Sequence, residues 1–329
     1  MLCANLDESA GAQVWPEPSD NFVITPQLAD LVERALGYLR AGCPVNLAGP
    51  AGSGKTTLAL HLAAQLRQPV TLLHGDDDFG SSDLVGSDRG YRKSKLVDNF
   101  IHSVVKTEEM MKTLWIDNRL TTACRYGHVL IYDEFTRSRP EANNVLLSVL
   151  GERLLNLPKS RGSGEGYLEV HPKFRAILTS NPQEYAGVHR SQDALMDRLI
   201  TIHMHHYDRE TEVAITVASS GVPRKTAEQI VDLLDYMRRK DATGQRPSIR
   251  AAIMIARVLA HREVDFDPAD PVFQDTCRDV LHLGSRRNGH NGSTTANDEL
   301  QAAIEEAFPT RHGHPAHPRP TAEMTEMLR

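Results

Sequence analysis

A glycine-rich loop carries the most specific chemical signal in this sequence. Residues 49–56 read GPAGSGKT, which matches the pattern G-x-x-x-x-G-K-[ST] of a phosphate-binding loop. The glycines allow successive backbone N–H groups to face a phosphate chain, and the start of the next helix adds positive potential. We therefore predict a nucleotide site formed by Gly49, Pro50, Ala51, Gly52, Ser53, Gly54, Lys55, Thr56 and Thr57.

Two side chains of this loop have separate roles in such a site. The Lys55 ammonium would reach the β- and γ-phosphates of ATP, and the Thr56 hydroxyl would bind Mg²⁺. The alternative is a glycine-rich turn with an exposed lysine. The nucleotide site is favoured because its mechanism needs a strand before the loop and a helix after it, and both patterns are present.

An acidic pair follows an apolar run in HVLIYDEF, where residues 129–132 are typical of a buried strand. Asp133 and Glu134 would then lie at the carboxyl edge of a sheet, where open α/β folds bind ligands. We predict that Asp133 binds Mg²⁺ and that Glu134 is the general base that polarises the attacking water. The alternative is that the pair only begins a loop.

A polar residue also ends the apolar run in RAILTSNPQEYAG. The amide of Asn181 at the same sheet edge would hold a water in line with the γ-phosphate. Asparagine before a proline is also a common turn residue, so the residues alone leave both interpretations open.

Alternating strand and helix patterns must position these residues. Apolar runs at 45–48, 70–73, 129–132, 175–179 and 199–202 predict five short strands. Their alternation with helical stretches is typical of an α/β fold, in which a parallel sheet has helices on both faces. Thr25 and Pro26 predict the start of an amphipathic helix that runs to about Gly42.

Composition divides the chain into four regions. After His206 the strand pattern ends, and residues 210–219, 224–240, 249–261 and 272–283 are typical of helices. We predict a flexible leader at 1–20, an αβα nucleotide-binding core at 21–206, an all-helical lid at 207–284 and a largely disordered tail at 285–329. The tail contains one short amphipathic piece, with Leu300, Ala303, Ile304 and Ala307.

Charge and composition exclude several classes of protein. The 37 Lys+Arg and 43 Asp+Glu give a net charge of −6, which argues against a dedicated nucleic-acid binder. No apolar run approaches the roughly 18 to 20 residues that span a bilayer, and the first residues lack a secretory pattern, so we expect a cytoplasmic protein without a membrane anchor. The four cysteines are far apart and suggest free thiols in a reducing compartment.

The order of the motifs resembles that of the AAA+ ATPases. The phosphate loop is followed by a strand ending in DE, a strand ending in SNP, the segment ALMDRL, and a helical region that opens with RPSIRAA. Within this superfamily the sequence is similar to the MoxR branch. The stretches DEFTRSRPEANNVLLSVLGERLLNLP and TSNPQEYAGVHRSQDALMDRLITI more closely resemble the gas-vesicle protein N family, the AAA+ component of gas-vesicle gene clusters. The similarity runs from about Phe22 to about Leu283.

The resemblance implies a role for each matching residue. Lys55 and Thr56 would be the Walker A pair, Asp133 and Glu134 the Walker B pair, and Asn181 the sensor-1 residue.

Two arginines receive roles from the same resemblance. Arg198 in MDRL would be the arginine finger presented to a neighbouring subunit, and Arg250 in PSIRAA would be the sensor-2 residue of the lid. Arginine suits both positions because its planar, permanently charged guanidinium grips phosphate oxygens. The alternatives are a surface salt bridge for Arg198 and an exposed helix-start charge for Arg250. Arg137 and Arg139 would face either a neighbouring subunit or solvent.

Two inserts, at about 83–125 and 157–172, interrupt the sheet pattern. In a ring ATPase such inserts commonly face the pore or the substrate, so the resemblance implies a client-handling surface. The basic residues of the first insert would bind an acidic client or form a solvated charge run: Arg89, Arg92, Lys93 and Lys95. Histidines at 203–206 and in the tail at His312, His314 and His317 have no defined partner set, so we predict no metal site there.

The resemblance implies an ATP hydrolase that uses Mg²⁺ and assembles as a ring, expected to be a hexamer. It would drive the assembly or growth of gas vesicles by remodelling shell or accessory proteins. The alternatives are a nucleotide-gated structural component with negligible turnover, a MoxR-type chaperone for another client, and a nucleic-acid motor. The acidic net charge disfavours the motor, and we expect no membrane partner.

Overall fold

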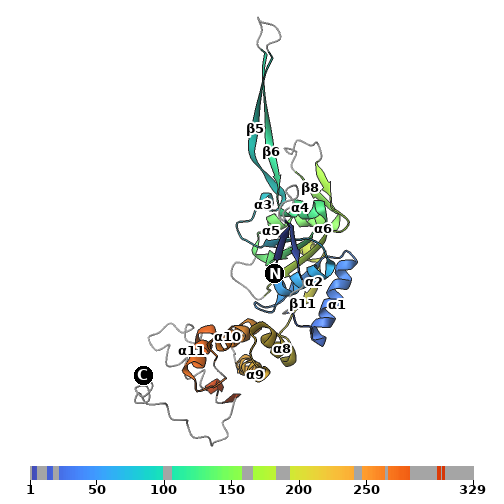
Figure 1. Cartoon of the computed structure of the whole chain (residues 1–329). Coiled ribbons are helices and arrows are strands. Elements are labelled where there is room, and N and C mark those ends of the chain that lie inside the picture. Colours follow the sequence, from blue (N-terminus) through green and yellow to red (C-terminus); the bar gives the residue numbers. More distant parts are fainter. Residues whose placement is uncertain are drawn as a thin grey trace, which may run out of the picture.

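The computed structural model is built around one seven-stranded sheet (Figure 1). It describes residues 2–5, 13–17, 22–98, 106–157, 166–182, 193–240, 247–263, 266–281, 302–304 and 306–307. Five strands of this sheet are parallel and lie in the order β4-β7-β10-β3-β11, which confirms the predicted parallel sheet. Their bounds are β3 Val45–Ala48, β4 Val70–His74, β7 Val129–Asp133, β10 Arg175–Ser180 and β11 Ile200–His203.

The first residues of the chain differ from the expectation of a flexible leader. Strands β1 (Leu2–Asn5) and β2 (Gln13–Pro16) pair antiparallel, and β2 continues the sheet by pairing with β4 at Val14 and Val70. This pairing covers the edge of β4, which would otherwise present unpaired N–H and C=O groups. Such an edge contact joins residues far apart in the chain, so local composition does not reveal it.

The central strand β7 explains how the sheet supports two hydrophobic cores. Val129 and Ile131 belong to one buried cluster, whereas Leu130 and Tyr132 belong to another. Successive side chains of a strand point to opposite faces, so each face of the sheet has its own core. All five residues of β7 are buried, as expected for a parallel strand covered on both faces.

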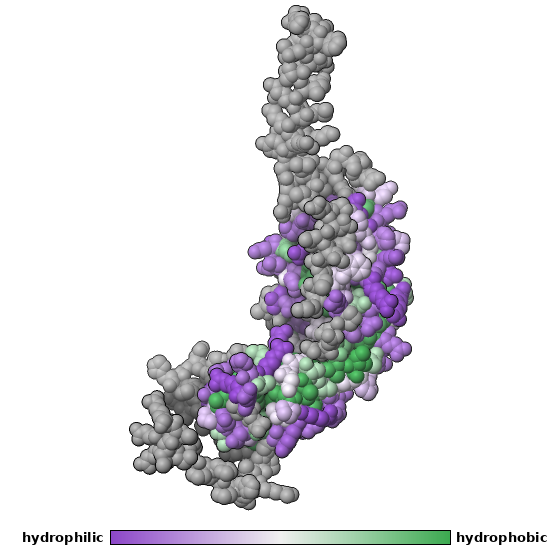
Figure 2. Space-filling model, viewed as in Figure 1, coloured by the Kyte–Doolittle hydropathy of each residue, from purple (hydrophilic) through white to green (hydrophobic). Residues whose placement is uncertain are grey.

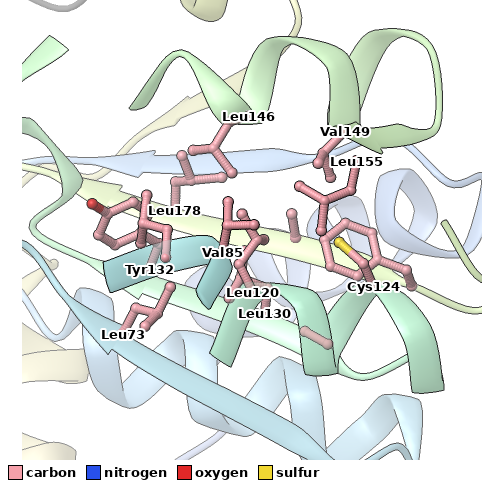
Figure 3. Close-up of a cluster of buried hydrophobic side chains, with 14 of the residues drawn as sticks. Leu73, Val85, Leu120, Cys124, Leu130, Tyr132, Leu146, Val149, Leu155 and Leu178 are labelled. Atoms are coloured by element: carbon pink, nitrogen blue, oxygen red, sulfur yellow. The ribbon is translucent and has the colours of Figure 1, made fainter. Parts of the chain in front are cut away.

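Helices cover both faces of the sheet. The core on one face includes buried residues of α1 (Pro26–Arg40) and α2 (Lys55–Leu66). The predicted start of α1 is confirmed, because Thr25 Oγ1 accepts a hydrogen bond from the Leu28 N–H. Figure 3 shows the core on the other face, where side chains of β4, β7 and β10 meet those of the helices. These helices are α3 (Ser81–Val85), α4 (Arg119–Tyr126), α5 (Pro140–Asn143) and α6 (Val145–Gly151).

An antiparallel strand pair lies at each predicted insert, although the first strand of the second pair precedes the insert predicted at 157–172. The first forms β5 (Gly86–Asp98) and β6 (Lys106–Asp117), which Figure 1 shows extending far from the central sheet. The second forms β8 (Leu154–Asn156) and β9 (Tyr167–Glu169). Two short elements complete this part of the chain, the 3-10 helix η1 (Phe135–Arg137) and α7 (Asp193–Met196).

The C-terminal part of the chain is helical and has a separate hydrophobic core. Its helices are α8 (Arg209–Ser220), α9 (Arg224–Lys240), α10 (Ile249–Arg262) and α11 (Pro271–Val280). On the face shown in Figure 2, hydrophilic residues cover most of this region, and hydrophobic residues gather toward its junction with the sheet domain. Among the described residues, no helix has the length and apolar character needed to cross a membrane.

The short amphipathic piece predicted within a disordered tail is part of the lid. Residues 302–304 and 306–307 are helical, and Ala303 and Ile304 are buried in the lid core. Ala307 packs against the same core, and Glu306 contacts Tyr236 and Lys240 of α9. The amphipathic piece that the sequence set apart within the tail is therefore ordered against the lid, because its apolar face repays the entropy of ordering. Leu300, His312, His314 and His317 lie outside the described residues.

Candidate nucleotide site

The glycine-rich loop joins β3 to α2, as predicted, and the lid lies directly over it. Gly52 has a φ of 75°, a conformation that favours glycine. A Cβ atom on Gly52 would lie 2.4 Å from Ser248 Oγ and 3.4 Å from the Cβ of Arg250. Because Ser248 is the N-cap of α10, the start of this lid helix lies against the loop.

Lys55 is the first residue of α2, and its side chain folds back under the loop. The residue is 8% exposed, and its Nζ donates to the carbonyl oxygens of Gly49 at 2.9 Å and Pro50 at 2.8 Å. These contacts satisfy the hydrogen-bonding needs of a buried ammonium. The same contacts hold the charge beside the loop, where the backbone N–H groups would receive a phosphate chain.

Thr56 and Asp133 form a pair of oxygen ligands suited to Mg²⁺. The Thr56 hydroxyl lies 2.9 Å from Asp133 Oδ1 and 3.0 Å from Oδ2, although the two residues are 77 positions apart. Mg²⁺ prefers oxygen ligands and commonly takes one or two from protein, with waters and phosphates completing its shell. The residues therefore fit the predicted metal. The imidazole Nδ1 of His74 lies 3.6 Å from Asp133 Oδ2, at the end of the adjacent strand β4.

Glu134 turns sharply away from the end of β7. Its φ is 52°, a left-handed conformation that is uncommon for a residue with a side chain. The turn brings its carbonyl so close to Gly75 that a Cβ atom there would lie 2.0 Å from the Glu134 oxygen. The side chain is 41% exposed and its Oε2 lies 2.7 Å from Arg137 Nε. The predicted base is thus partly accessible and paired with a residue of η1.

Three polar residues follow the apolar run of β10, two at the end of the strand and one directly after it. Thr179 hydrogen bonds to Asp133 and to the backbone of Glu134, and Ser180 donates from its hydroxyl to Asn46 Oδ1 at 3.1 Å. Asn181 is 5% exposed and follows directly. Since β10 lies between β7 and β3, Asn181 ends its strand between the acidic pair and the phosphate loop. The sequence prediction did not include Thr179.

The two predicted arginines occupy different places. Arg198 is exposed, and its Nη1 donates to the carbonyl oxygen of Ala194 at 2.7 Å, so it lies on the surface after α7. It also approaches α6, since a Cβ atom on Gly151 would lie 2.8 Å from Arg198 Nε. Arg250 is the second residue of α10 and lies beside Gly52 of the loop. Arg250 therefore lies beside the phosphate loop of its own chain, whereas Arg198 is exposed on the surface.

A small pocket is lined by the loop, the lid and the segment after β11. Its lining includes Pro50–Ser53 of the loop, His205–Tyr207 after β11, and Ser248 and Ile249 of the lid. Tyr207 closes one side, because its hydroxyl donates to the carbonyl oxygen of Ser53 at 2.9 Å. Burial, with the nearby charge of Glu212, raises the pKa of Tyr207 to about 12, so its proton remains available for this hydrogen bond.

The remaining predicted residues lie outside this cluster. Arg89, Arg92, Lys93 and Lys95 belong to β5, in the extended hairpin. Arg139 Nε lies 3.5 Å from Asp77 Oδ1, so it pairs within its own chain. His205 and His206 line the pocket described above. In the parts of the chain that the structure describes, no group of three or more His, Cys, Asp or Glu residues could hold a metal ion.

The chain is similar to known proteins over most of its length. Residues 44–199 match the AAA domain (dynein-related subfamily). The gas vesicle ATPase GvpN of Ancylobacter aquaticus is 50% identical over 305 residues, which cover 92% of this chain and 85% of that protein. The gas vesicle ATPase GvpN of Haloferax mediterranei is 43% identical over 284 residues, which cover 86% and 80%. Protein NorQ of Paracoccus denitrificans is 26% identical over 227 residues, covering 69% and 76%.

Proposed function

Because this chain belongs to the GvpN family of gas vesicle ATPases, we propose that it hydrolyses ATP to drive the assembly or growth of gas vesicles by remodelling vesicle proteins. The observation that carries the proposal is the hydrogen bond between Thr56 and Asp133. It joins the phosphate loop to the acidic pair at the carboxyl edge of the sheet, where a nucleotide and its metal would meet.

Hydrolysis of ATP needs positioning and charge more than covalent help from the protein. Lys55 exchanges its bonds to Gly49 and Pro50 for phosphate oxygens, and the loop N–H groups bind the rest of the phosphate chain. Thr56 and Asp133 hold Mg²⁺, which supplies further positive charge to the phosphates when bound. Glu134 accepts a proton from the attacking water, and Asn181 orients that water.

Arg198 completes the site of a neighbouring subunit in this proposal. Its exposed position after α7 agrees with a role in trans, and a planar guanidinium suits the charge that develops on the transferred phosphoryl group. Arg250 acts within the chain, beside the loop. The working form is therefore a ring, which we propose to be a cytoplasmic hexamer associated with the gas vesicle.

In this proposal, the contact between α10 and the phosphate loop transmits a change of the bound nucleotide to the lid. A change of the loop at Gly52 must alter its contact with Ser248, and Ser248 begins a helix of the lid. Lid and core then rotate as the nucleotide changes. In Figure 1 the hairpin of β5 and β6 extends away from the central sheet, and in this proposal it contacts the client.

The proposal is tested in a host that forms gas vesicles and from which the native copy of this gene has been deleted. The wild-type chain should restore vesicles, and the Glu134→Gln variant should not, because it binds ATP without hydrolysing it. The matched control is Glu141→Gln, which removes a carboxylate in the nearby helix α5. Normal vesicles with Glu134→Gln would favour a nucleotide-gated structural component with negligible turnover.

A further inference from the structure

One buried hydroxyl, that of Thr179, contacts both residues of the acidic pair. Thr179 Oγ1 lies 2.5 Å from Asp133 Oδ1 and 2.8 Å from the backbone nitrogen of Glu134. A backbone N–H only donates, so the hydroxyl oxygen accepts from Glu134. Its single hydrogen is then left for the Asp133 carboxylate, and hydrogen bonds to a charged group are the stronger kind.

The position of Thr179 follows from the register of two parallel strands. β7 and β10 pair Ile131 with Ile177 and Tyr132 with Leu178. The next residues on the two strands are Asp133 and Thr179, which brings their side chains together at the carboxyl edge. Thr179 has no exposed surface, so its hydroxyl has no water with which to exchange these bonds.

The second donor to Asp133 is Thr56, which has another task in the proposed site. In the structure the Thr56 hydroxyl hydrogen bonds to the Asp133 carboxylate. In the proposed site the Thr56 oxygen would also bind Mg²⁺, so the position of this donor would depend on whether the metal is bound. The terminal torsion of an aspartate is broad, so a carboxylate without a fixed donor can rotate. Thr179 then remains as the fixed donor.

The same hydroxyl supports the unusual backbone of Glu134. A left-handed conformation is disfavoured for a residue with a side chain, because its Cβ crowds the following carbonyl oxygen. The bond from the Glu134 N–H to Thr179 Oγ1 helps to hold the backbone at that φ of 52°. Because this backbone sets the direction of the Glu134 side chain, the hydroxyl acts on the base as well as on the metal ligand.

We propose that Thr179 is a positioning residue that sets the metal-binding carboxylate of Asp133 and the general base Glu134 with one hydroxyl. This inference rests on the proposed function of the acidic pair. A threonine that only filled space in the sheet would affect the stability of the fold. A positioning threonine must also change how nucleotide binding depends on Mg²⁺.

The test compares Thr179→Val, which keeps the shape but loses the hydroxyl, with Thr179→Ser, which keeps the hydroxyl. The matched control is Thr121→Val in α4, because Thr121 is also fully buried and its hydroxyl donates a hydrogen bond, to the carbonyl oxygen of Val85 in α3 at 2.5 Å. Each variant is purified as the full chain. ADP binding is measured by calorimetry in EDTA and over a series of Mg²⁺ concentrations, together with kcat, KM and thermal unfolding.

The Thr179→Val protein should need about tenfold more Mg²⁺ to reach the same ADP affinity, and its kcat should fall by about tenfold or more. Both changes are the size expected for the loss of a hydrogen bond to a charged group. Its ADP affinity in EDTA should stay within about twofold of wild type, since the phosphate loop is unchanged. Thr179→Ser should restore both properties, and Thr121→Val should change neither. If Thr179→Val does not fold, Thr179→Ala takes its place in the same measurements.

A Thr179→Val protein with the Mg²⁺ dependence and kcat of wild type would overturn the inference. So would a serine variant as defective as the valine variant, because the hydroxyl would then be irrelevant. The Mg²⁺ dependence of ADP binding does not need turnover. An inactive wild-type chain would therefore refute the proposed hydrolysis while leaving the role of Thr179 open to the binding result.

Discussion

The guanidinium of Arg137 lies against the carboxylate of Glu134, with 2.7 Å between Nε and Oε2. The pair is formed within one chain, across the short helix η1. Both side chains are partly exposed, at 46% and 41%, so water competes for each partner. In this arrangement the predicted base is paired with an arginine, and the attacking water must compete with Arg137 for its carboxylate.

Removal of Arg137 should therefore raise basal turnover. Exposed ion pairs contribute about 0–1 kcal/mol, so Arg137→Ala is expected to increase kcat by at most about fivefold. The measurement is steady-state ATP hydrolysis at saturating Mg-ATP. The control is Arg139→Ala, which removes a neighbouring arginine that pairs with Asp77 instead. A tenfold loss of kcat in Arg137→Ala alone would show that Arg137 assists the reaction.

The buried ion pair of Glu212 and Arg238 should make the lid sensitive to the loss of either partner. The two side chains are 2% and 8% exposed, with 2.8 Å between Arg238 Nη1 and Glu212 Oε2. Arg238 also donates from Nε to the carbonyl oxygen of Pro247, just before α10. Arg238→Met leaves a buried carboxylate without its partner, which is expected to cost about 3–5 kcal/mol at neutral pH.

The cost of Arg238→Met should depend on pH. Burial raises the pKa of Glu212, and Arg238 opposes that shift, so removing Arg238 raises the pKa further. A carboxyl with a raised pKa in the folded state destabilises the fold as pH rises above its unfolded value of about 4.3. The difference in unfolding free energy between variant and wild type should be larger at pH 8 than at pH 5. An equal difference at both values would contradict this account.

The helical piece formed by residues 302–304 and 306–307 should stabilise the lid. Ile304 is 4% exposed within the lid core, and truncation of a buried isoleucine to alanine costs about 2–4 kcal/mol. Ile304→Ala should lower the free energy of unfolding by this amount, measured by urea denaturation. The control is Met254→Ala on α10. Because Met254 is 47% exposed, this substitution should change the free energy of unfolding little. No loss in Ile304→Ala would show that the piece is dispensable.

Activity should require contact between subunits if Arg198 acts in trans. Loss of such an arginine can cost on the order of 10³-fold or more in rate. Arg198→Ala and Glu134→Gln chains, each inactive alone, should recover some hydrolysis when mixed, because certain interfaces pair an intact base with an intact arginine. The measurement is turnover in mixed oligomers isolated by sizing. Absence of recovery in oligomers that contain both chains would contradict a shared site.

Local patterns were sufficient to predict the strands and the residues at their ends. A run such as 129–132 is apolar at every position because both faces of its strand are covered, and Asp133 and Glu134 then reach the sheet edge. The contacts that refine the site depend on residues far apart in the chain. Thr179 meets Asp133 through strand register, and Ser248 meets Gly52 through the placement of the lid. The spacing of residues along the sequence does not specify either contact.

Two short segments, β2 and the helical piece around Ile304, are ordered for the same physical reason. β2 adds to the sheet through one paired position, Val14 with Val70, and its own composition gives no strong strand period. Ile304 is buried by helices that precede it by more than twenty residues. In both cases a distant partner decides whether a weakly patterned segment is ordered.

The central claim is that this chain binds ATP through its phosphate loop and hydrolyses it with Glu134. The most direct measurement compares ATP binding and turnover in wild type, Lys55→Ala and Glu134→Gln under the same conditions. Lys55→Ala should weaken binding, because the charge that meets the phosphates is lost. Glu134→Gln should bind ATP as wild type does and release no phosphate. Wild-type turnover by Glu134→Gln would contradict the claim.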